Sequence, residues 1–114
     1  MRFLRRLWGR LRDWWAGRIR YRASRVTEVP DSPRPGRVYL EGERGEVWVA
    51  ALICPCGCGE LIQLNLQPDQ RPRWGVTEHA DGAVTINPSI WRHVGCKSHF
   101  FLRTGLVAWC DSRR

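Results

Sequence analysis

The hydrophobic pattern divides the chain into one helical segment followed by short strand-like runs. In residues 1–25 apolar side chains recur at intervals of three and four, while arginines fill most of the other positions. The recurring positions are Leu4, Leu7, Trp8, Leu11, Trp15 and Ile19. This spacing gathers apolar side chains on one face of a helix. We therefore predict a basic amphipathic helix over residues 1–25.

A proline-rich segment follows the predicted helix. Residues 26–37 include Pro30, Pro33, Pro35 and Gly36, which favour an extended chain with turns. We interpret this segment as a linker between the helix and a domain over residues 38–114.

The pattern of the remaining residues is that of short strands. Residues 46–54 are apolar after the initial Glu46, and apolar and polar residues alternate in residues 60–66. Asp81–Gly82 and Thr104–Gly105 each stand between two β-like runs, which is typical of hairpin turns. We predict a mainly β fold, a small antiparallel β domain with a zinc knuckle, preceded by the N-terminal helix.

The positive charge belongs to the predicted helix and not to the domain. Of the net charge of +8, residues 1–25 hold nine arginines and one acid, whereas residues 26–114 hold ten basic and ten acidic residues. Three interpretations of the apolar helix face remain open. It could pack on its own domain, lie on an anionic membrane surface, or dock to a partner protein or nucleic acid. Nucleic acid is the least favoured partner, because the neutral domain offers no second basic patch.

The expected location is the cytoplasm, with peripheral attachment to the inner membrane as an alternative. The basic N-terminus is not followed by the apolar run of a secretory signal, and no segment is long enough to span a membrane. In a reducing compartment, clustered cysteines bind metal more often than they form disulfides.

Two cysteine motifs about 40 residues apart predict one metal site. The run CPCGC at 54–58 places three thiols within five residues, and its glycines allow the sharp turns that bring them together. GCKSH at 95–99 adds a Cys-x-x-His pair. The candidate ligands are Cys54, Cys56, Cys58, Cys96 and His99. Zinc, our predicted cofactor, takes four such ligands in a tetrahedron. Unliganded buried thiols, a disulfide and an iron–sulfur centre are the alternatives.

The number of protein ligands decides what the predicted zinc can do. Four ligands make a closed, structural site, whereas three leave a position for water that zinc activates as a nucleophile. Glu60, two residues after Cys58, could then act as general base. A Ser–His pair is a second catalytic possibility. Ser98 adjoins His99, but neighbouring residues on a strand face opposite ways, and Ser89 is expected to cap a turn after Pro88.

The combined motifs resemble those of a family of short bacterial and phage proteins. The shared pieces are CPCGCGE, LNL, RPRW, DGAVTINPSI, GCKSHFFL and GLVAW, within residues 48–109. Members of that family occur beside genes for ubiquitin-like proteins and their conjugating enzymes. The resemblance implies metal binding and a deconjugating, peptidase-like role, with the four motif cysteines, Ser98 and His99 as the shared positions.

Together with the predicted zinc site, the resemblance implies a zinc-dependent peptidase or isopeptidase that acts on a bacterial ubiquitin-like modifier. The expected partners are that modifier or its conjugation enzymes. Two alternatives remain: a non-catalytic interaction module with structural zinc, and a membrane-attached accessory of a defence system that works through its N-terminal helix.

Overall fold

Residues 20–110 form eight β-strands arranged in two four-stranded sheets. The computed structural model describes this part of the 114-residue chain. The strands are β1 (Arg22–Val26), β2 (Arg37–Glu43), β3 (Glu46–Ile53), β4 (Leu61–Asn65), β5 (Gly75–Glu78), β6 (Val84–Trp91), β7 (His99–Arg103) and β8 (Leu106–Trp109). Within residues 20–110 there is no helix, and hence none able to cross a membrane. The prediction of a mainly β domain is confirmed for this part of the chain.

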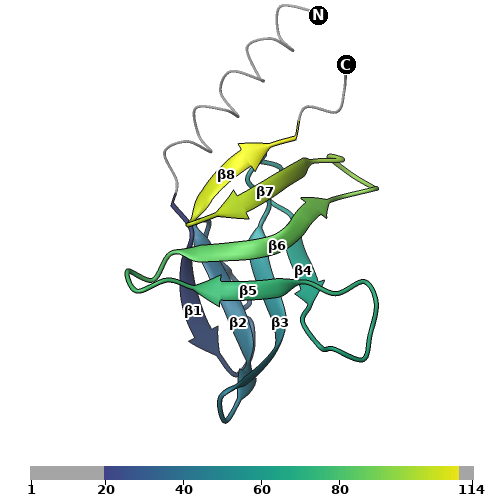
Figure 1. Ribbon diagram of the computed structural model, residues 1–114. Helices are drawn as coiled ribbons and strands as arrows, with labels where there is room; N and C mark the ends of the chain where they lie inside the picture. Colours follow the sequence, from purple (N-terminus) through teal and green to yellow (C-terminus); the bar gives the residue numbers. More distant parts are fainter. Residues whose placement is uncertain (1–19, 111–114) are drawn as a thin grey trace, which may run out of the picture.

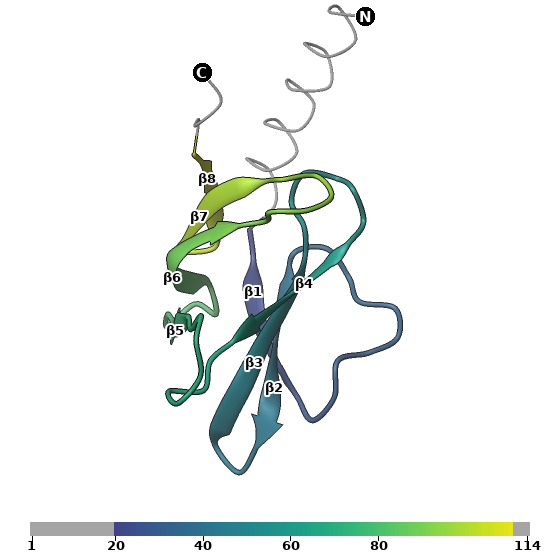
Figure 2. The ribbon, with the colours of Figure 1, turned by 90° about the vertical axis from the view of Figure 1, so that its right-hand side faces the viewer.

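The two sheets form the layers of a small sandwich. One sheet has the order β1-β2-β3-β4 and the other β5-β6-β7-β8. All pairings within the sheets are antiparallel except that of β1 with β2, which is parallel. In Figure 1, β5 and β6 run across the strands of the first sheet, whose lower ends extend beyond β5. Figure 2 shows the sheets edge-on as two layers.

Side chains from the inner faces of both sheets fill the core. Alternation in β4 buries Ile62 and Leu64 while Gln63 stays exposed, as the period of two in the sequence predicts. The other fully buried side chains include Leu52, Ile86, Ile90, Phe100 and Leu102. Burial of this apolar surface stabilises the fold, at roughly 25 cal/mol for each Å² removed from water.

The first strand lies where the sequence predicted the end of a helix and the start of a linker. Residues 1–19 of the predicted helix lie outside the described residues, but Arg22–Val26 form β1. Tyr21 is buried and donates a hydrogen bond from its hydroxyl to the carbonyl of Ile53, and Ala23 packs against the core. Alternating inward side chains therefore favour a strand here.

Candidate active site and metal centre

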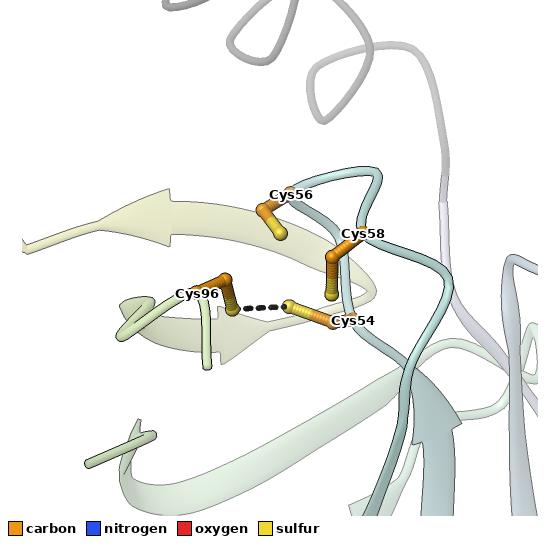
Figure 3. A group of neighbouring side chains, drawn as sticks. All are labelled: Cys54, Cys56, Cys58 and Cys96. Atoms are coloured by element: carbon orange, nitrogen blue, oxygen red, sulfur yellow. Dashed lines mark hydrogen bonds between the residues drawn. The ribbon is translucent and has the colours of Figure 1, made fainter. Parts of the chain in front are cut away.

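Four thiols from two loops meet at one end of the sandwich. Cys54, Cys56 and Cys58 lie in the loop between β3 and β4, and Cys96 lies in the loop between β6 and β7. Their sulfur atoms all lie within 4.8 Å of one another, and Figure 3 shows the four side chains facing a common point. The structure therefore brings together the two motifs that lie far apart in the sequence.

The donor set fits a tetrahedral metal ion. Zinc–sulfur bonds of about 2.3 Å at tetrahedral angles require sulfur atoms about 3.8 Å apart. The Cys54 and Cys96 sulfurs are 3.6 Å apart, too far for a disulfide, and all described cysteines are free. Four soft thiolate ligands are typical of structural zinc. The four cysteines could thus hold one zinc ion, which would have no open position for water.

Two glycines allow the first loop to fold back on itself. Gly57 and Gly59 have φ angles of 94° and 82°, which side-chain-bearing residues rarely adopt. The Cys54 amide donates to the carbonyl of Glu60 over 2.8 Å, which closes the loop. The three thiols of the loop therefore turn to the same side.

The surroundings of the thiols set their protonation before a metal binds. Burial raises the pKa of both Cys54 and Cys56 above the ordinary value. Burial also opposes ionisation of Cys96, but hydrogen bonds from the Ser98 hydroxyl and backbone and from neighbouring thiols outweigh it and lower its pKa to about 6. Metal binding must therefore displace protons from the two buried thiols.

Arg92 and Glu60 form an ion pair at the edge of the thiol cluster. Arg92 Nη2 lies 2.6 Å from Glu60 Oε1, while Nη1 lies 3.4 Å from Cys96 Sγ and 3.7 Å from Cys58 Sγ. The carboxylate predicted as a general base is thus engaged by a guanidinium.

Ser98 and His99 face different neighbours, as expected for adjacent residues at the start of a strand. Ser98 is buried, and its Oγ lies 3.1 Å from Cys96 Sγ and 3.7 Å from Cys54 Sγ. His99 instead places Nε2 3.0 Å from Ser89 Oγ. His99, predicted as a fifth candidate ligand, lies outside the group of four thiols.

The Ser89–His99 contact depends on an irregularity in β6. The pairing of β6 with β7 shifts register between Ile86 and Ile90, and Ser89 lies in this interval. The expectation that Ser89 caps a turn is therefore wrong: it belongs to a strand, and its side chain is aimed at an imidazole.

An indole ring fixes the plane of the His99 imidazole. Trp91 is the cross-strand partner of His99, and their rings stack with centroids 4.7 Å apart and an interplanar angle of 10°. His99 Nδ1 is buried and has no hydrogen-bond partner among residues 20–110. Asp81, in the turn between β5 and β6, accepts a hydrogen bond from Arg20 and not from His99.

One sequence feature indicates that the strand is irregular next to Ser89. Asn87–Pro88 interrupts an otherwise β-like run, and proline inside a strand often accompanies a bulge. The hairpin then brings the residues just after that bulge beside the start of β7, where His99 lies.

Comparison with known families gives one match. The family model described as "Bacterial ubiquitination-like system serine protease (BubE)" matches residues 25–110, three quarters of the chain. No curated protein and no solved structure matches.

Proposed function

We propose that this chain, which belongs to the BubE family of bacterial ubiquitination-like system proteins, is a serine peptidase. Its substrate would be the ubiquitin-like modifier of that system or a conjugate of it. In this proposal Ser89 is the nucleophile and His99 the general base.

The separation of 3.0 Å between Ser89 Oγ and His99 Nε2 carries this proposal. It is within hydrogen-bond reach, as a serine activated by a histidine requires. Nε2 would take the hydroxyl proton as Oγ bonds to the scissile carbonyl carbon, and His99 would then give that proton to the leaving amine. Water would hydrolyse the resulting ester by the reverse proton path.

The metal would have a structural role in this mechanism. Bound zinc would neutralise clustered thiolates and join the two loops. Ser98, which contacts the thiol cluster, comes directly before His99 in the chain, and Cys96, a member of the cluster, lies three residues before it. A fixed cluster would therefore fix the start of β7 and the position of the imidazole.

Two observations favour the serine over the zinc-bound water of our first hypothesis. Four thiols would fill a tetrahedral ion, leaving no position for the water. The Glu60 carboxylate that would move protons is already hydrogen-bonded to Arg92.

The free edge of β5 supports binding of an extended peptide. The amide of His79 donates to the carbonyl of Ala83, so alternation along the antiparallel ladder directs the main-chain groups of Val76 and Glu78 away from β6. β5 is the edge strand of its sheet within residues 20–110. A modifier tail could pair with these groups as an added strand.

A hollow lined by both apolar and charged side chains accompanies this edge. Its volume is about 400 Å³, and its lining includes Leu40, Val47, Leu66, Trp74 and Val76. Trp74 Nε1 donates to the main-chain carbonyl of Ser89 over 3.2 Å. Trp74, which directly precedes β5 and lines the hollow, thus connects the proposed peptide-binding edge to the main chain of Ser89.

The proposal is tested by replacing single serines in the metal-loaded full chain. The substrate is the system's ubiquitin-like protein carrying a C-terminal extension, and cleavage is followed by mass spectrometry. Ser89→Ala should lower the rate at least about a thousandfold. Ser98→Ala should lower the cleavage rate much less than Ser89→Ala does. Ser32→Ala, at an exposed position, should cleave at the wild-type rate.

Cleavage by Ser89→Ala at the wild-type rate would overturn the proposal. If the wild type binds the modifier without cleaving it, the interaction module with structural zinc becomes the better description. The exposed side chains of Trp91 and Val94 would then be its first candidate contacts.

A further inference from the structure

Arg92 is a largely buried charged side chain whose hydrogen-bond partners are the thiol cluster and the Glu60 carboxylate. Its side chain is only 16% exposed, whereas that of its partner Glu60 is 55% exposed. A charged group removed from water in this way needs compensating partners. Arg92 finds them in the Glu60 carboxylate and in the sulfurs of Cys58 and Cys96.

The backbone of Arg92 also joins both ends of the loop that carries Cys96. The Arg92 amide donates to the carbonyl of Ser98 over 2.8 Å, which closes the loop at its base. Gly95 leaves room for the ion pair, because a Cβ there would lie 3.1 Å from Glu60 Oε1 and 3.7 Å from Arg92 Nη2. Both the main-chain closure of the loop and the absence of a side chain at Gly95 are therefore compatible with the position of the guanidinium.

A divalent ion bound by four thiolates leaves two negative charges in excess. A guanidinium donating to two of the sulfurs offsets one of these charges and draws electron density from the thiolates. The two thiols that Arg92 contacts, Cys58 and Cys96, are the exposed pair of the cluster, whereas Cys54 and Cys56 are buried.

We propose that Arg92 is the positioning and counter-charge residue of the metal centre, donating to the Cys58 and Cys96 thiolates while Glu60 orients its guanidinium. Glu60 then serves the metal site through Arg92 and not as a base. This inference rests on the metal centre and is independent of the chemistry proposed for Ser89.

Metal affinity and the spectrum of bound cobalt test the inference. Zinc affinity is measured by chelator competition on the full chain, and Co²⁺ substitution reports the thiolate-to-metal charge-transfer band. Arg92→Gln should weaken zinc binding about ten- to hundredfold, which corresponds to the loss of about one charge-assisted hydrogen bond. The cobalt band should move to lower energy, because the sulfurs become more electron-rich.

Matched variants separate the charge of Arg92 from its geometry. Arg92→Lys keeps the charge but loses the planar fork, and Glu60→Gln loses the ion pair; both should give intermediate affinities. Arg25→Gln is the control, because Arg25 pairs with Glu78 on the surface and has no thiol partner among its described contacts.

Unchanged zinc affinity and an unchanged cobalt band in folded Arg92→Gln would overturn the inference. If that variant does not fold, Arg92→Lys decides, and wild-type values in both measurements would overturn it. A wild-type protein that binds no zinc would instead refute the metal centre itself, while loss of cleavage in Ser89→Ala bears only on the proposed peptidase.

Discussion

Replacing Cys96 should destabilise the domain more than replacing any one thiol of the other loop. Cys96 is the single described ligand from the β6–β7 loop, and it lies 42 residues from Cys54 in the chain. If the metal is treated as a cross-link that closes a loop of that length, it lowers the conformational entropy of the unfolded chain. This raises the free energy of unfolding by about 4 kcal/mol. Since small domains are stable by roughly 5–15 kcal/mol, this is a large share of the total.

Thermal unfolding with excess zinc measures the effect. A loss of about 4 kcal/mol should lower the Tm of Cys96→Ser by about 20 °C in a domain of this size. Cys58→Ser is the matched control, because it also removes one thiolate but leaves ligands in both loops. Its Tm should fall by less than half as much.

Two outcomes would refute this reasoning. A Tm of Cys96→Ser within about 3 °C of the wild type would show that the metal does not tie the loops together. Equal losses in Cys96→Ser and Cys58→Ser would show that the number of ligands matters and the length of the closed loop does not.

Two further predictions concern the sheet edge and the core. Val76→Pro, which removes an outward-facing amide, should raise KM for the modifier substrate at least about tenfold, whereas Val76→Ala, which keeps the amide and only shortens a side chain of the hollow, should raise it much less; equal KM values in the two variants would exclude strand addition. Tyr21→Phe loses the hydrogen bond to Ile53 and should cost about 1 kcal/mol in urea unfolding at pH 7. Burial raises the pKa of Tyr21, so its contribution is complete below about pH 10 and declines above it as the unfolded chain ionises. The difference between the two proteins should therefore narrow above pH 10, and a constant difference up to pH 11 would contradict this assignment.

The strands of the domain were predictable because their signals are local. The apolar run of β3, the alternation of β4 and the turn residues Asp81–Gly82 and Thr104–Gly105 each act within a few residues. The strand β1 was not predicted, because its short segment also fits the helical period of the residues before it. Its parallel pairing with β2 depends on contacts between distant residues that no local pattern contains.

The thiol cluster was predictable in part, and the Ser–His pair was not. Clustered cysteines in a reducing compartment favour a shared metal ion, so ligand chemistry linked residues 54–58 to Cys96 without knowledge of the fold. Ser89 reaches His99 only through the register shift in β6, and Arg92 reaches the thiols only once both loops are folded. Such geometry follows from strand pairing and cannot be obtained from residue spacing.

The position of β1 determines where the chain can be shortened. The family match begins at residue 25, inside a strand that begins at Arg22. A truncation at that boundary would discard Tyr21, expose the backbone of β2 and open the core. A truncated protein that is meant to test the role of the N-terminal segment should therefore begin at or before Arg20.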